Sequence, residues 1–277
     1  IFSKKKIYYL YLELNIYNKK ITPSIISSLD YRPSPNLLNS LIKYDKKKIN
    51  IENYSLNRIW DNKKLKEKDY KSLNSFFWLF GLDLRSSKTD TQNIILQWIN
   101  KNHRYNSKSW EVDIMAKRII AWTSNSRLTY EDGSNDYKNK FNTIIKKQIN
   151  HLINEIEGSE WADDKIIGCA AIILTGISYK DKNHYLKTGL NLLRKLVKFS
   201  FDNDGFPKSR NIRQLCFYLK YFILIREWLK ESQGEIPDFI NENIYYLGQG
   251  YAFTWQNNKK DFLFNGNHEI NNINFDH

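Results

Sequence analysis

Apolar side chains recur at three- and four-residue steps through most of this chain, in segments separated by short polar connections. This spacing places the apolar residues of each segment along one face of a helix. The stripes run from Tyr70 to Leu84, Ile94 to Ile99, Ile114 to Trp122, Tyr137 to Ile156, Ile166 to Ile177, Leu186 to Val197 and Ile212 to Leu229, and Pro237 opens a last helix. Such helices are stable only when their stripes are buried against neighbours, so the pattern predicts about four helical hairpins in succession.

The arrangement of these hairpins decides the fold class. Stacked antiparallel helix pairs form either a solenoid or a closed α/α toroid. The sequence has no repeat of fixed period, which argues against tetratricopeptide, HEAT or armadillo arrays. We therefore predict a mainly α fold, an incomplete α/α toroid over residues 61–249, preceded by an irregular lead-in segment over residues 1–60 with turn signals at Pro23, Pro33 and Pro35 and a β-like piece at 48–56.

The last part of the chain changes period. In YAFTWQ, residues 251–256, and in DFLFNG, residues 261–266, apolar and polar residues alternate with period two, which is typical of strands. We expect residues 250–277 to be the first strands of a C-terminal β-sandwich that is truncated at His277. The chain also begins without Met and without a small-residue cleavage site, so we expect a fragment with no visible export signal.

Charge and missing motifs limit the partners. The formal net charge of +13 favours polyanions such as nucleic acid, anionic lipid or acidic polysaccharide, although abundant Lys, Asn, Ile and Tyr are equally expected from an AT-rich genome. No five or six basic residues stand in a row, and Walker, dinucleotide-binding and zinc motifs are absent. No apolar run reaches the ~20 residues that span a bilayer. We therefore predict neither a nucleic-acid partner nor membrane insertion.

Cysteine, histidine and buried arginine residues give no sign of a metal or cofactor. Cys169 and Cys216 lie in apolar helical stretches and are predicted to be buried, inert thiols. The histidines His103, His151 and His184 fall in Lys- and Asn-rich stretches that we expect to be exposed, without the spacing of metal ligands. Arg118, inside an apolar stripe, is predicted to form a structural ion pair. We expect neither a metal nor a cofactor.

Seven short motifs in a fixed order carry a family resemblance. They are WD at Trp60, FFWLFGLDLRS, ILQWI, SWEVDIMAKRIIAWTS, WADDKIIGCAAIILTG, DGFPKSRN and LFNG. Together they cover residues 60–266 and resemble the heparinase II/III-like family, and most of all its short bacterial branch. The resemblance implies an α/α toroid followed by a β-sandwich, and a polysaccharide lyase that cleaves uronate-containing chains by β-elimination in the periplasm or cell envelope.

The resemblance also implies where a site would lie. The family's catalytic Asn-His pair falls on Asp163 and Asp164, and its Tyr falls on Gln214, so these three are the implied catalytic positions although none keeps the family residue. Trp161 and the polar pair Arg210-Asn211 are the implied substrate-binding residues. An ionised Asp beside a uronate repels the carboxylate that must be neutralised, so the family mechanism does not transfer unchanged.

Each of these residues also has a structural interpretation, and two other functions stay open. Asp163 or Asp164 can cap the helix, Trp161 can be a hydrophobic staple, and Arg210 and Asn211 can simply be solvated. Paired carboxylates would also suit a glycoside hydrolase. A non-catalytic scaffold that binds a polyanion or glycan would explain why the family's catalytic residues are missing. His268, after LFNG, could face a cleft from the sandwich.

Overall fold

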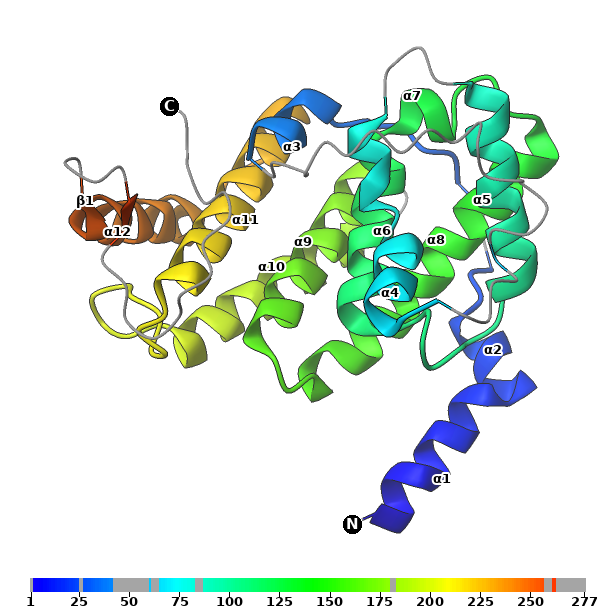
Figure 1. Cartoon of the computed structure of the whole chain (residues 1–277), viewed down its shortest axis with the longest axis horizontal. Helices are drawn as coiled ribbons and strands as arrows, with labels where there is room; N and C mark the ends of the chain where they lie inside the picture. The colour runs from blue at the N-terminus through cyan, green and yellow to red at the C-terminus, as the bar shows by residue number, and fades with distance from the viewer. Residues whose placement is uncertain are drawn as a thin grey trace.

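The computed structural model describes residues 2–24, 27–41, 60, 65–82, 87–179, 183–256 and 261–262, and these are mainly α-helical (Figure 1). Its helices are α1 (Phe2–Glu13), α2 (Asn15–Ile21), α3 (Pro35–Leu41), α4 (Glu67–Ser75), the 3-10 helix η3 (Phe77–Gly81), α5 (Lys88–Asn102), α6 (Val112–Ser124), α7 (Ser126–Thr129), α8 (Asn135–Glu155), the 3-10 helix η4 (Ile156–Gly158), α9 (Ala162–Ser178), α10 (Asn183–Ser200), α11 (Ile212–Glu231) and α12 (Asp238–Thr254). Two short strands, β1 (Trp255–Gln256) and β2 (Asp261–Phe262), follow.

The long helices form two layers. In chain order α4, α6, α9 and α11 pack one against the next, and they make one layer. The helices between them make the other: α8 packs on α6 and α9, α10 on α9, and α12 on α11, while α5 packs on α8 (Figure 1). The prediction of a mainly α fold is confirmed, and α9 packs against α6, α8, α10 and α11.

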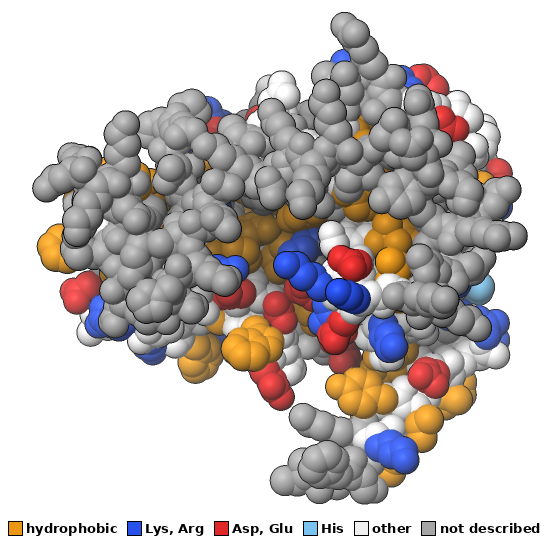
Figure 2. Space-filling model, in the orientation of Figure 1, with side chains coloured by type: hydrophobic (Ala, Val, Ile, Leu, Met, Phe, Trp, Pro, Cys, Tyr) orange, Lys and Arg blue, Asp and Glu red, His pale blue; other side chains and the backbone are white. Residues whose placement is uncertain are grey.

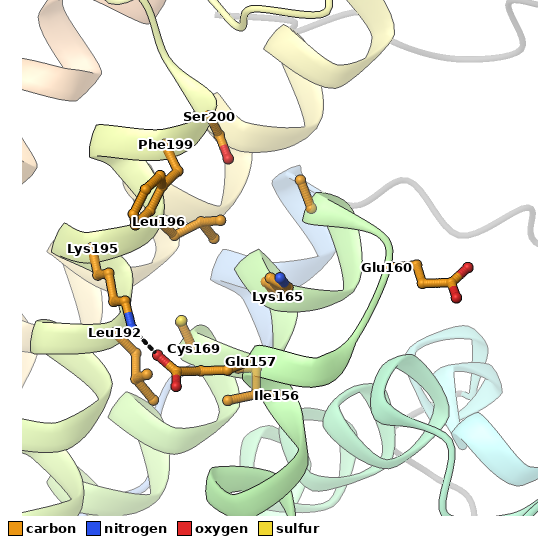
Figure 3. Close-up of a pocket in the computed structure, with 11 residues that line it drawn as sticks. Ile156, Glu157, Glu160, Lys165, Cys169, Leu192, Lys195, Leu196, Phe199 and Ser200 are labelled. Carbon is orange, nitrogen blue, oxygen red and sulfur yellow. Dashed lines mark hydrogen bonds and ion pairs between the residues drawn. The ribbon is translucent and has the colours of Figure 1, made fainter. Parts of the chain in front are cut away.

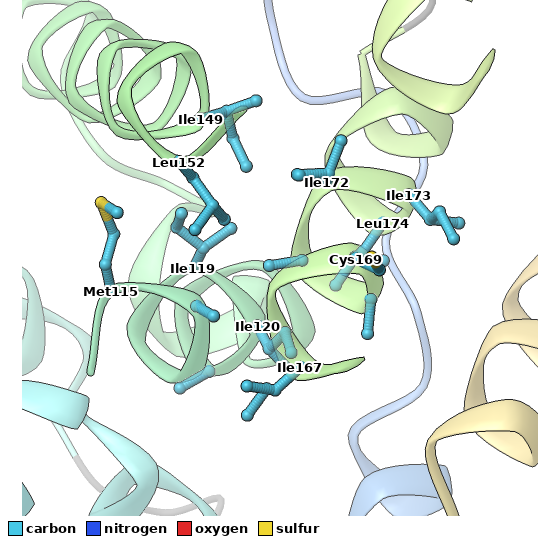
Figure 4. Packing of buried hydrophobic residues seen from close by; sticks show 14 of the residues in the cluster. Met115, Ile119, Ile120, Ile149, Leu152, Ile167, Cys169, Ile172, Ile173 and Leu174 are labelled. Carbon is cyan, nitrogen blue, oxygen red and sulfur yellow. The ribbon is translucent and has the colours of Figure 1, made fainter. Parts of the chain in front are cut away.

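The core fills the space between α6, α8 and α9. Ile119 of α6 lies beside Leu152 of α8, and Ile120 of α6 lies beside Ile167 of α9, all of them almost fully buried (Figure 4). Close packing also sets the distance between α9 and α10, because a Cβ built on Gly176 would lie 2.3 Å from the backbone nitrogen of Leu186. Only glycine allows this approach.

Arg118 is fully buried in α6, and the predicted ion pair is wrong. Its guanidinium donates to the carbonyls of Asn74 and Ser109 at 2.8 and 2.9 Å and lies 4.0 Å from the ring centroid of Trp98. Within the described residues it has no ion pair with a carboxylate. Backbone carbonyl oxygens accept the hydrogen bonds that a carboxylate was expected to accept.

The opening of the chain is more regular than predicted. Residues 1–60 were expected to be irregular, yet they contain α1, α2 and α3. Pro35 begins α3 rather than breaking structure, since proline is favoured in the first turn of a helix. The backbone nitrogen of Asp30 donates to the carbonyl of Ser178 at 2.9 Å, and α3 packs on α11 and η3. The β-like piece at 48–56 lies outside the described residues.

The stripe from Tyr70 to Leu84 is not one helix. α4 ends at Ser75, Phe76 adopts a left-handed backbone with φ of 57°, and η3 follows. The turn lets the Phe76 ring lie 5.0 Å from Trp122 and 6.1 Å from Trp98, centroid to centroid. Burial of this aromatic side chain offsets the backbone strain. Leu84 lies outside the described residues.

The C-terminal change to strands comes later than predicted. Tyr251 to Thr254 were expected to begin a strand but are the last turn of α12, where Tyr251 stacks on Trp255 four residues on, with an interplanar angle of 9°. A spacing of four residues brings side chains together on a helix. β1 and β2 then pair antiparallel. The β-sandwich and the boundary at residue 250 stay predictions, and LFNG and His268 lie outside the described residues.

No helix within the described ranges is both long enough and apolar enough to cross a lipid bilayer.

Candidate functional site

Helix α9, where a site was predicted, begins two to three residues earlier than a cap at Asp163 or Asp164 would place it. Trp161 occupies the N-cap position without a side-chain cap, and Asp163 and Asp164 lie in the first turn. The predicted cap by either aspartate is therefore wrong. Both carboxylates still face the positive end of the helix dipole, which favours negative charge there. The Trp161 indole is 69% exposed.

A tight turn before α11 positions the second half of the site. The Asp202 carboxylate accepts from the backbone nitrogens of Asp204 and Phe206 at 3.1 and 2.8 Å, and Gly205 supplies a φ of 72°. Arg210 has a left-handed φ of 56°, and its guanidinium forms an ion pair with Asp202 at 2.6 Å. The predicted substrate-binding arginine is thus held by a carboxylate of its own turn.

Asn211 is the N-cap of α11. Its side-chain oxygen accepts from the backbone nitrogens of Arg213 and Gln214 at 2.9 and 3.4 Å. This supplies partners for donors that the helix leaves unpaired. The side chain that was predicted to bind substrate therefore has a structural role at the helix start, as the alternative interpretation allowed.

One hydrogen bond joins the two helix starts. Gln214 Nε2 donates to Asp163 Oδ1 at 2.8 Å, across a separation of 51 residues in the chain. The hydroxyl of Ser209 donates to Gln214 Oε1 and so orients the amide. Two of the three predicted catalytic positions are therefore in direct contact, and both side chains are half-buried.

The start of α6 completes the arrangement. Burial raises the pKa of the Asp164 carboxyl, and the nearby charges of Asp113 and Asp163 raise it further. Ser159 Oγ donates to Asp164 Oδ2 at 3.2 Å, and Lys117, paired with Asp113 at 3.0 Å, acts in the opposite direction on the pKa. Figure 2 shows acidic and basic side chains next to one another near the middle of the face that it presents.

A phenol lies beside the first carboxylate. Burial of Tyr218 in α11 strongly raises its pKa, and the charge of Asp163 and a hydrogen bond to it add to the rise. Tyr218 therefore keeps its proton at neutral pH and acts as a donor. With Asp113, Asp163, Asp164 and Gln214 it forms a group of proton donors and acceptors at one end of the α6, α9 and α11 layer.

Sequence reasoning missed part of this group. Asp113, Lys117 and Tyr218 were not singled out, although Asp113 stands in the first turn of α6 just as Asp163 does in α9. That shared position was the signal that could have found it. Conversely, the hydrogen bonds and ion pairs of the described residues do not link Trp161 or Arg210 to Asp163 or Asp164.

The histidine and cysteine predictions have mixed outcomes. His151 is 2% exposed, so the expected exposure is wrong, because its ring packs on Tyr17, Tyr105 and Trp110 and its Nδ1 lies 2.6 Å from the Tyr17 hydroxyl. Cys169 and Cys216 are buried as predicted, and burial raises the pKa of each thiol to about 12. Among the described residues no group of three or more His, Cys, Asp and Glu side chains could hold a metal ion.

Comparison with known proteins gives little beyond this geometry. No protein-family model and no curated protein matches the chain. Among solved structures, heparan sulfate lyase HepC from Pedobacter heparinus matches with a TM-score of 0.49 and 11% sequence identity, over 71% of this chain and 32% of that one. The chain thus spans about a third of the length of that lyase. A likeness this slight supports no inference about the chain.

Proposed function

We propose that the chain binds an acidic, uronate-containing polysaccharide across the first turns of α6, α9 and α11, and cleaves it by β-elimination as part of an incomplete α/α toroid. The observation that carries the proposal is the hydrogen bond between Gln214 and Asp163. It ties together two helix starts that the sequence had implied to form one site. The basic net charge of +13 favours a polyanionic substrate.

β-Elimination needs a group that neutralises the uronate carboxylate, a base for the C5 proton and an acid for the leaving oxygen. Burial and neighbouring carboxylates raise the pKa of Asp164, which favours its protonated form, the form that can donate to the uronate carboxylate. Asp163 accepts hydrogen bonds and is the candidate base. Tyr218, beside Asp163, is the candidate acid. Backbone nitrogens at the start of α9, which has no side-chain cap, attract the substrate's anions.

The experiment is an absorbance assay for unsaturated uronate on heparan, alginate and related polymers. We expect product with the wild-type chain and a loss of about 100-fold or more in turnover for Asp163→Asn. Asp136→Asn is the matched control, because Asp136 lies in the first turn of α8 and is exposed. No unsaturated product from any uronate polymer would contradict the lyase proposal. Binding without turnover would leave the non-catalytic scaffold as the function.

One observation favours a second candidate, a glycoside hydrolase. A carboxyl with a raised pKa beside ionised carboxylates is the arrangement of a general acid with its base. Asp164 beside Asp113 has this arrangement. Release of new reducing ends without unsaturation, lost in both Asp164→Asn and Asp113→Asn, would select hydrolysis. Either reaction would place the protein where such polymers occur, in the periplasm or cell envelope.

A further inference from the structure

A separate pocket of about 400 Å³ opens on the other side of the first turns of α9 (Figure 3). It lies between η4 and the last turns of α10. Ala162 and Lys165 line it, whereas Asp163 and Asp164 do not. What binds there is therefore independent of the proposed function, and neither inference depends on the other.

Four charged residues line the pocket, namely Glu157, Glu160, Lys165 and Lys195. Glu157 forms an ion pair with Lys195 at the rim, and the Glu160 carboxylate points away from the pocket (Figure 3). Lys165 has no ion pair with a described residue. Lys165 and Cys169 both line the pocket and stand one turn apart on α9. An anion in the pocket would therefore meet one uncompensated positive charge.

The rest of the lining is largely apolar. Ile156, Leu192 and Leu196 form walls, and Ser200 adds a hydroxyl. Phe199 stands at the rim and is 68% exposed, so its ring is open to solvent. A ring with a flat apolar face, from a sugar or an arene, can stack there. Apolar walls with a few convergent polar groups are typical of small-molecule sites.

We propose that this pocket binds a small organic carboxylate that carries a ring, with the carboxylate on Lys165 and the ring over Phe199. A uronic acid and an aromatic acid share this chemistry. Both fit the single positive charge and the stacking surface. The Lys195–Glu157 pair contributes by keeping the Glu157 carboxylate from repelling the bound anion.

Isothermal titration calorimetry with D-glucuronate and with phenylacetate tests the proposal and separates the two sources. We expect at least one acid to bind the wild-type chain. Lys165→Met, which keeps the apolar stem and removes the charge, should weaken that binding about 10-fold or more, as expected when a hydrogen bond to a charged group is lost. Phe199→Ala should weaken it as well, and Lys195→Met should do so by exposing Glu157.

Lys198→Met is the matched control, since Lys198 lies on the same last turns of α10, is exposed and does not line the pocket. It should bind as the wild type does. Thermal melting of each variant separates lost binding from lost folding, because Lys165 is only half-buried and its replacement should leave the melting temperature nearly unchanged. Failure of both acids to bind at millimolar concentration would overturn the proposal. Equal binding by the wild type and Lys165→Met would overturn it too.

Discussion

Two polar regions in the same layer of helices differ in how their charges are paired. Around Arg118, in the middle of α6, a buried cation meets the carbonyls of Asn74 and Ser109, the amide oxygen of Gln148 at 3.3 Å and the face of Trp98. Burial lowers the pKa of Arg118 to about 9, yet the group stays charged at neutral pH. At the start of the layer, carboxylates instead stand beside one another, and the pKa of Asp164 is raised.

This difference suggests that the Arg118 region stabilises the fold, whereas the Asp164 region serves a reaction. A buried cation whose three guanidinium nitrogens each donate a hydrogen bond holds neighbouring elements in one arrangement, here α4, the segment before α6 and α8. Like charges gathered in a half-buried group lower stability, and such groups are typical of sites where proton transfer occurs. We therefore expect substitutions in the Arg118 region to weaken the fold, and substitutions near Asp164 to change activity more than folding.

The largest expected effect comes from removing the buried cation. Arg118→Met should lower the free energy of unfolding by about 3 kcal/mol or more, since buried acceptors lose their donors and the cation leaves the Trp98 ring. Urea denaturation followed by circular dichroism measures it. Lys117→Met, one residue earlier and half-exposed, is the control and should cost less than about 1 kcal/mol. Equal stabilities of the two variants would remove the contrast between the regions.

Sequence periodicity predicted the helices well where only one face of the helix is buried. The stripe of Ile94, Ile95, Trp98 and Ile99 is buried in α5 as expected, because the spacing of apolar residues follows directly from the helical turn. It could not predict the break at Phe76. There a left-handed residue is held by aromatic rings from α5 and α6, and such long-range packing leaves no local signal.

The candidate site was predictable in position but not in detail. The resemblance implied Asp163 and Gln214 together, and the structure places them 2.8 Å apart. It could not reveal that Asp202 holds Arg210, because that ion pair depends on the backbone of the turn at Gly205. His151 was misjudged because its polar neighbours Lys147 and Gln148 are themselves buried, so a polar stretch did not mean an exposed one.

A second and smaller effect is the pH dependence of stability that comes from buried His151. Burial lowers its pKa from 6.5 to about 3, so below pH 6.5 the unfolded chain binds a proton that the folded chain excludes. Stability is therefore complete above this pH and falls as the pH drops, by up to about 1.4 kcal/mol per pH unit. His151→Gln does not titrate and should lose this part of the slope between pH 6.5 and about 5. Identical slopes in the two proteins would show that His151 is not held neutral.

The smallest expected effect has the opposite sign and tests the acidic region. The pKa of Asp164 is raised in the folded state, so folding is favoured most at low pH, and that favour is lost as the pH rises from the ordinary value of 3.8 through the folded pKa. Asp164→Asn removes the charge and can still accept from Ser159. It should raise the free energy of unfolding at neutral pH by about 0.5–2 kcal/mol, with the gain vanishing in acid.

Urea denaturation of Asp164→Asn at neutral and at acid pH, with Asp136→Asn as the exposed control, measures this gain. Turnover on the polymer assay should fall in Asp164→Asn while stability rises, because the same carboxyl would then be both unfavourable for folding and required for the reaction. A less stable Asp164→Asn at neutral pH would mean that Ser159 and Lys117 hold the carboxylate favourably. The Asp164 carboxylate would then be stabilised by its partners, as the Arg118 cation is. The proposal that proton transfer occurs at this end of the layer would lose its electrostatic basis.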